Sequence, residues 1–166
     1  MRVWAFRLFL AASIAVAGFW AWRWLFPGPE QVIRKELAQL AAAASISPNE
    51  APLAKLAKAQ QLSTFFANDA QVSVDIPGRQ YQSFNGREEI QQAAIGARAI
   101  LNSLKVHFLD VDVKVAPDNN SAMVHLTATA DLPGEKVPEV EELELRFQKI
   151  ERDWLISRVE TVKTLR

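Results

Sequence analysis

The hydrophobic and polar positions of the chain follow three patterns in succession. Residues 8–22 form an apolar run without a charged side chain. From about residue 29 to residue 101, apolar side chains recur mostly at intervals of three and four, the spacing of an amphipathic helix. After residue 103 they alternate with polar side chains, as in strands with one buried face. This order predicts an N-terminal hydrophobic segment, then a helical region, then a sheet.

Three helices are predicted in the helical region. Pro29 at a first helical position begins the first helix. The stretch Ser47-Pro48-Asn49-Glu50 is a capping box, and the helix that it opens is expected to run to about Asn68. Asn85 caps the third helix. Two short strands, near residues 72–76 and 80–84, are predicted between the second and third helices.

The alternation in the sheet region changes phase once, between Phe108 and Leu109. A period-2 pattern that shifts within one run predicts a β-bulge, which bends a long strand. A turn is predicted at residues 117–120. Pairing Val115 with Ala122 across this turn places the apolar residues of both strands on one face. Two further strands follow, and the last begins at Trp154.

The apolar run near the N-terminus is predicted to be a membrane anchor. Its 15 residues would rise about 22 Å as a helix, and snorkelling of Arg7 and Arg23 would lengthen the embedded part toward the roughly 30 Å hydrocarbon core. Trp20, Trp22 and Trp24 would then form a belt at the membrane interface. The basic N-terminus is expected in the cytoplasm. We therefore expect a single-pass protein of a bacterial inner membrane, with its domain in the periplasm or outside the cell.

Two alternatives to the anchor stay open. Ala15-Val16-Ala17 matches a signal-peptide cleavage site, and cleavage there would leave the stretch GFWAWRWLF at the start of a soluble protein. Such an exposed apolar start favours aggregation, which argues for the uncleaved anchor. A buried core helix is the third interpretation. The first two interpretations both export the remainder of the chain.

Composition narrows the possible partners. All 19 acidic residues follow Pro27, whereas three of the 19 basic residues precede it, so the body carries a net charge of −3. Its scattered charges form no basic stripe, and nucleic acid is not an expected partner. The absence of cysteine and the presence of only two histidines give no support to a metal site, and no cofactor is predicted. We divide the chain into a cytoplasmic stub and anchor, 1–28, and a domain, 29–166.

Three segments carry a resemblance to a known family: residues 65–72 (FFANDAQV), 85–90 (NGREEI) and 149–156 (KIERDWLI). Their order resembles the nuclear transport factor two-like superfamily, which includes SnoaL-like cyclases, ketosteroid isomerases and scytalone dehydratase. The resemblance extends from about Glu30 to the C-terminus. It implies an α+β, cone-shaped fold in which three N-terminal helices pack on a bent antiparallel sheet. Members of this superfamily include enzymes and many proteins without catalysis, so the fold alone does not give an activity.

The resemblance also suggests where a ligand would lie. Enzymes of the superfamily place Asp, His or Tyr side chains inside the cone. No motif of the dehydratases or isomerases can be placed on this sequence, so no catalytic residue is assigned. The predicted pocket residues are Phe65, Asp75, Tyr81, Phe108 and Trp154.

The opposite face of the sheet offers a candidate interface. In the register above, Asp112 lies opposite His125, and Asp110 lies opposite Thr127, on the face away from the apolar core. An Asp–His pair is found in general-base catalysis, but on an outer face it is more often a solvated cross-strand pair. A homodimer through this sheet face would make Asp110, Asp112 and His125 interface residues.

These observations predict a membrane-anchored, extracytoplasmic domain that binds a protein partner or a small apolar ligand without catalysis. The periplasmic domains of some type IV secretion inner-membrane subunits share the layout of an anchor followed by a cone. The alternative is an isomerase- or dehydratase-like enzyme acting on a small apolar substrate in the cone. A deep cavity containing Tyr81 or Asp75 would favour the enzyme, and a cone filled by Phe65, Phe108 and Trp154 would argue against it.

Overall fold

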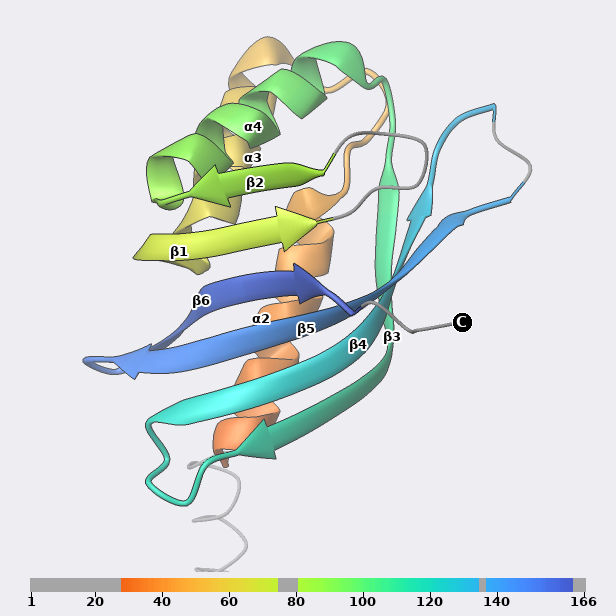
Figure 1. Cartoon of the computed structure of the whole chain (residues 1–166). Helices are drawn as coiled ribbons and strands as arrows, with labels where there is room; N and C mark the ends of the chain where they lie inside the picture. Colours follow the sequence, from red (N-terminus) through yellow and green to blue (C-terminus); the bar gives the residue numbers. More distant parts are fainter. Residues whose placement is uncertain (1–27, 75–80, 135–136, 163–166) are drawn as a thin grey trace, which may run out of the picture.

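The computed structural model describes residues 28–74, 81–134 and 137–162 (Figure 1). The predicted anchor and the alternative cleavage site lie outside these residues. None of the helices in the described part has the length and hydrophobicity of a membrane span. The elements are α2 (Pro29–Ala44), α3 (Pro52–Thr64), β1 (Phe66–Val74), β2 (Gln82–Asn85), α4 (Arg87–Ile100), β3 (Lys105–Val115), β4 (Ser121–Asp131), β5 (Glu139–Ile150) and β6 (Asp153–Thr161).

The six strands form one curved sheet in the order β2-β1-β6-β5-β4-β3. Every neighbouring pair is antiparallel except β1 and β6, which are parallel. The expected α+β arrangement of three helices and a bent sheet is confirmed, but the sheet is mixed and not antiparallel throughout. The parallel pair was not predicted, because the sequence pattern indicates only pairings between strands that are neighbours along the chain. The pairing of Phe66 with Ile156 joins segments 90 residues apart.

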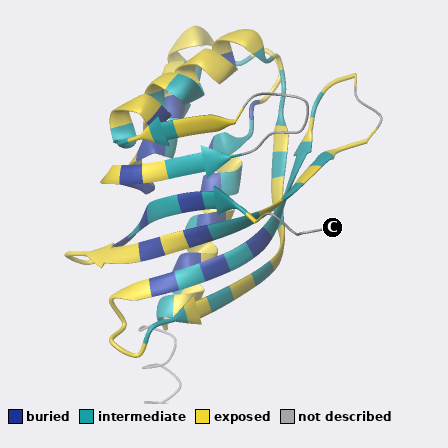
Figure 2. Cartoon of the chain, in the orientation of Figure 1, coloured by how far each residue is buried: buried dark blue, intermediate teal, exposed yellow. Residues whose placement is uncertain are grey.

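Helix α2 crosses the inner face of the sheet and packs on β3 (Figure 1). It begins as predicted with Pro29 in its first turn, where the missing N–H costs no hydrogen bond. Its buried side chains recur at helical spacing: Ile33, Leu37, Leu40 and Ala43. They join the buried residues that alternate along β4 and β5 (Figure 2). Burying each large aliphatic side chain in this core contributes roughly 1.5–3 kcal/mol.

Helix α3 begins later than the capping box predicts. Its first residue is Pro52, because Asn49 adopts a left-handed conformation with φ of 62° that no helix continues. The carboxylate of Glu50 still accepts a hydrogen bond from the backbone N–H of Ser47 at 3.0 Å, as in a capping box. The helix ends at Thr64 and not near residue 68.

The start of α4 also differs from the prediction. Its N-cap is Gly86 and not Asn85. Gly86 has φ of 85°, and a Cβ there would lie 3.2 Å from the carbonyl oxygen of Asn68. The backbone N–H of Asn85 instead donates to Glu89 Oε2 at 2.7 Å. Glycine is therefore required at the position that follows the predicted cap.

The predicted bulge is present in β3, but it follows Leu109 and does not lie between Phe108 and Leu109. The ladder to β4 pairs Leu109 with Thr127 and Asp112 with His125, so β3 contains one extra residue between these pairs. Asp110 lies in the bulge with φ of 52°. The predicted pairing of Asp112 with His125 is confirmed. The predicted pairing of Asp110 with Thr127 is wrong, because the extra residue shifts the register and Thr127 pairs with Leu109 instead.

Candidate functional site

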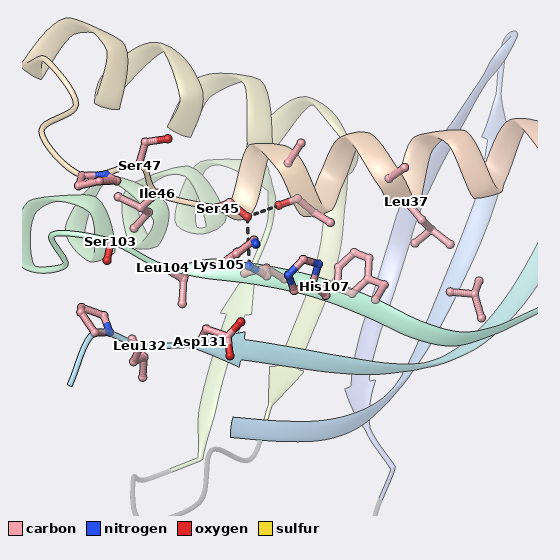
Figure 3. A pocket seen from close by; sticks show the side chains of 18 of the residues that line it. Leu37, Ser45, Ile46, Ser47, Ser103, Leu104, Lys105, His107, Asp131 and Leu132 are labelled. Carbon is pink, nitrogen blue, oxygen red and sulfur yellow. Dashed lines mark hydrogen bonds between the residues drawn. The ribbon is translucent and has the colours of Figure 1, made fainter. Parts of the chain in front are cut away.

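A cavity of about 970 Å³ lies between the C-terminal half of α2 and the first half of β3 (Figure 3). The loop after α2 and the residues at the end of β4 complete its wall. The apolar lining residues are Leu37, Ala38, Ala41, Ala42, Ile46, Pro48, Leu104, Val106, Phe108, Val111, Leu132 and Pro133. The polar and charged ones are Arg34, Ser45, Ser47, Ser103, Lys105, His107 and Asp131.

One end of the cavity is fixed by the loop that follows α2. Ile46 and Leu104 exchange backbone hydrogen bonds of 2.8 and 3.0 Å. Ser45 Oγ accepts the backbone N–H of Val106 at 3.1 Å and donates to the carbonyl oxygen of Ala41 at 2.8 Å. These bonds are possible because β3 is the edge strand of the sheet, so its outer backbone groups have no neighbouring strand.

The other end is fixed at the bulge. Arg34 Nη1 donates to the carbonyl oxygen of Val111 at 2.9 Å, and its Nε donates to Glu30 Oε1 at 2.9 Å. A bulge releases backbone groups from the strand ladder, which leaves this carbonyl available to α2. Helix α2 is thus attached to β3 on both sides of the cavity.

A buried ion cluster lies behind the loop. The side chain of Arg98, which is 3% exposed, donates to Glu50 Oε2 at 3.0 Å and to the carbonyl oxygen of Ser45 at 3.1 Å. It also donates to the carbonyl oxygen of Ala43. Lys58 donates to the other carboxylate oxygen of Glu50. Arg98 therefore holds the last turn of α2 and the loop that forms the cavity wall.

The pKa of Glu50 is lowered from its ordinary value by this cluster. Burial of the carboxylate raises the pKa, but the opposing effects together are larger. They are the hydrogen bonds from Lys58 and from the backbone of Ser47 and the positive charges of Lys58 and Arg98. Glu50 does not line the cavity, so its charge serves the structure of the wall.

The structure separates the five predicted pocket residues. Phe108 lines the cavity and packs against the core. Phe65 and Trp154 are buried in the core and do not line the cavity. Tyr81, which is 59% exposed, precedes β2 and is also absent from the lining. Asp75 lies outside the described residues.

The predicted interface residues lie on the outer side of β3 and β4. Asp112 faces His125 across the strands, but the two are engaged elsewhere: Asp112 Oδ2 lies 3.2 Å from Lys114 Nζ, and His125 Nε2 lies 3.8 Å from Glu144 Oε2. Asp110 occupies the bulge. Their role in a homodimer stays a prediction. The predicted membrane-interface residues Arg7, Trp20, Trp22, Arg23 and Trp24 lie outside the described residues.

Several lining residues were not predicted. Lys105 and His107 alternate with Val106 and Phe108 along β3, so an ideal strand would turn the two pairs to opposite faces, yet all four line the cavity. Figure 3 shows His107 on β3, with Asp131 and Leu132 at the end of β4. An edge strand can present both sets of side chains to one cavity. The phase change in the sequence indicated that β3 bends. That β3 lies at the edge of the sheet depends on long-range pairing, which the sequence pattern does not show. The described residues contain no cluster of three side chains suited to a metal ion.

No protein-family model and no curated protein matches the chain. Solved structures do match its fold. A domain of unknown function with a cystatin-like fold from Nostoc punctiforme superposes with a TM-score of 0.63 and 17% identity, over 85% of this chain and 80% of that one. A nuclear transport factor two-like protein with a cystatin-like fold from Novosphingobium aromaticivorans gives 0.61 and 16%, over 92% and 86%.

A candidate scytalone dehydratase from Novosphingobium aromaticivorans superposes with a TM-score of 0.57 and 14% identity, over 82% of this chain and 84% of that one. At such identities the likeness concerns the fold and not the chemistry. These neighbours confirm the fold that the resemblance implied: the chain has a cystatin-like α+β fold, as the nuclear transport factor two-like neighbour does.

Proposed function

We propose that the chain is a non-enzymatic binding domain whose cavity takes a small apolar ligand, and that residues 1–28 anchor it to the membrane with the domain outside the cytoplasm. The cavity between α2 and β3 carries the binding role. Its volume of about 970 Å³ lies at the upper end of the range of about 300–1,000 Å³ typical of small-molecule sites. Its lining is mainly apolar with a few polar groups, as in such sites.

The attachment of the cavity wall supports this proposal. Arg34 binds β3 at one end, the bridge between Ile46 and Leu104 closes the other, and Arg98 holds the loop from behind. A wall that is already ordered loses little conformational entropy when a ligand binds. The buried pair of Glu50 and Arg98 lies outside the lining, where it supports the wall.

Filling the cavity tests the binding role. The neutral fluorescent probe 1-N-phenylnaphthylamine is titrated against the full chain and two variants on α2. Ala41→Phe places a large side chain in the lining, whereas Gln39→Phe places the same side chain at an exposed position outside it. We expect Ala41→Phe to weaken binding by about tenfold or more, a loss of about 1.4 kcal/mol, and Gln39→Phe to bind as the wild type does.

Circular dichroism spectra of the three proteins should coincide, which excludes loss of fold as the cause. Equal probe binding by Ala41→Phe and Gln39→Phe would contradict a ligand site in this cavity.

The second candidate is an isomerase- or dehydratase-like enzyme. It is favoured by His107 and Asp131, which line the same cavity, and by the fold shared with the candidate scytalone dehydratase. An imidazole and a carboxylate beside a bound substrate can exchange protons with it. Turnover of cyclic ketones or hydroxylated aromatic compounds by the wild type, lost in His107→Gln with the probe still bound, would support the enzyme over the binding domain.

A further inference from the structure

Several polar groups of the cavity lie at the end where the loop after α2 meets β3, whereas Arg34 lies at the opposite end. Ser47 follows Ile46, and Ser103 and Lys105 flank Leu104, its bridge partner. The bridge therefore brings two hydroxyl groups and one ammonium group to the same end of the cavity. The apolar side chains of α2 and of Phe108 and Val111 continue away from this end. Such a lining matches a molecule with an apolar body and one polar head.

The charged side chains that line the cavity distinguish between possible head groups. Among the described residues, Arg34 is occupied by Glu30 and by a backbone carbonyl, whereas Lys105 has no carboxylate within 4.0 Å. Asp131 lies opposite Lys105 in the strand ladder and lines the same cavity. The ammonium group of Lys105 is therefore available to a ligand, and Asp131 opposes an anion there.

We propose that the ligand is an amphipathic carboxylate, with an alkyl or ring body against α2 and Phe108 and its carboxylate at Lys105. The inference rests on the binding role proposed above and specifies the ligand class of the same site. The hydroxyl groups of Ser47 and Ser103 can donate further hydrogen bonds to the carboxylate. A bond from a charged donor to a charged acceptor is stronger than one between neutral groups, so the carboxylate should be preferred over an alcohol of the same length.

Three amphipathic compounds with unbranched chains of ten carbons, counting the carboxyl carbon of decanoate, and with different head groups test this inference. Decanoate, decanol and decyltrimethylammonium, each below its aggregation limit, compete with 1-N-phenylnaphthylamine for the full chain. We expect decanoate to bind about three- to fivefold more tightly than decanol, since Lys105 is exposed and its charge is partly screened. Decyltrimethylammonium should bind most weakly, and added salt should reduce the preference for decanoate.

Variants identify the residue responsible. Lys105→Gln should remove the preference for decanoate over decanol, and Asp131→Asn should increase it. Lys114→Gln is the matched control, because Lys114 lies on the same strand but outside the lining, paired with Asp112. The wild type and the variants are purified in the same lipid or detergent. Partitioning of each compound into that phase is therefore the same for every protein and does not affect the differences between them.

The outcomes separate the inference from the binding role. Displacement of the probe by all three compounds with equal affinity would overturn the carboxylate and leave the apolar site in place. Stronger binding of decyltrimethylammonium, or equal effects of Lys105→Gln and Lys114→Gln, would likewise overturn it. If none of the compounds displaces the probe, the proposed function itself fails.

Discussion

The carboxylate of Glu50 connects three separate parts of the fold. It accepts hydrogen bonds from Ser47 in the loop, Lys58 on α3 and Arg98 on α4, and its side chain is only 5% exposed. Glu50→Gln leaves the guanidinium of Arg98 buried without a counter-charge. We expect a loss of about 3 kcal/mol in the free energy of unfolding at neutral pH, as for other buried pairs that lose one partner. Urea denaturation of both proteins measures it.

The same measurement has a defined pH dependence. Because the pKa of Glu50 is lower in the folded state than the ordinary value of 4.5, the cluster stabilises the fold fully above that value. The stabilisation is lost as the pH falls through the folded-state pKa, so the difference between wild type and Glu50→Gln should shrink there. Glu30→Gln, which removes an exposed pair with Arg34, should cost less than about 1 kcal/mol at any pH. A difference that stayed constant into acid would contradict the assigned role.

At the scale of the element, α2 receives its C-terminal cap from another helix. Its last turn contains no basic residue, and Arg98 of α4 supplies the donors to the carbonyl oxygens of Ala43 and Ser45. Arg98→Lys keeps the charge but loses the planar fork that reaches several acceptors at once. We expect faster amide hydrogen exchange at Ile46 and Leu104, relative to Val124 in the core. Arg146→Lys, on the outer face, should leave all three rates unchanged.

The bulge in β3 gives a second prediction at this scale. Asp110 has a positive φ that β-branched residues adopt with difficulty, whereas Asp112 lies in the regular part of the same strand. Asp110→Val should destabilise the protein by about 1–3 kcal/mol, and Asp110→Gly should cost little. Asp112→Val should be neutral or stabilising, because valine favours extended strands. Thermal unfolding of the three variants compares them, and equal losses for the two valine variants would contradict backbone strain at Asp110.

The elements also show what the sequence could predict. Three features could be predicted, because each depends on chemistry or periodicity within a few residues. They are the start of α2 at Pro29, the pairing of Val115 with Ala122, and the bulge in β3. The start of α3 was misread, because Asn49 leaves the helical conformation within a sequence that satisfies the capping rule. The parallel pairing of β1 with β6 and the edge position of β3 join distant segments, and no local pattern encodes them. Lys105 and His107 line the cavity because β3 is the edge strand, so the sequence pattern did not predict either of them as a lining residue.

At the scale of the whole molecule, a retained anchor would join the domain at the N-terminal end of α2, whereas the cavity lies beside the C-terminal half of that helix. Gly28 is the N-cap of α2, so the first helix of the domain begins directly after it. An amphipathic ligand taken up by this cavity would come from, or return to, a bilayer surface if the anchor is retained. A domain released by cleavage after Ala17 would meet its ligand in solution. The state of the N-terminus therefore determines where binding takes place.

The mass of the chain recovered from the membrane fraction decides between these two states. We expect residues 1–17 to be present, because the three tryptophans from Trp20 to Trp24 suit an interfacial belt better than an exposed N-terminus. Protease added to intact spheroplasts should degrade the domain, since a basic N-terminus favours the cytoplasmic side. As a control, Trp20, Trp22 and Trp24 are replaced together by serine, which should release part of the protein from the membrane. A mass that lacks residues 1–17 would refute the anchor, and protection of the domain from protease would refute the orientation.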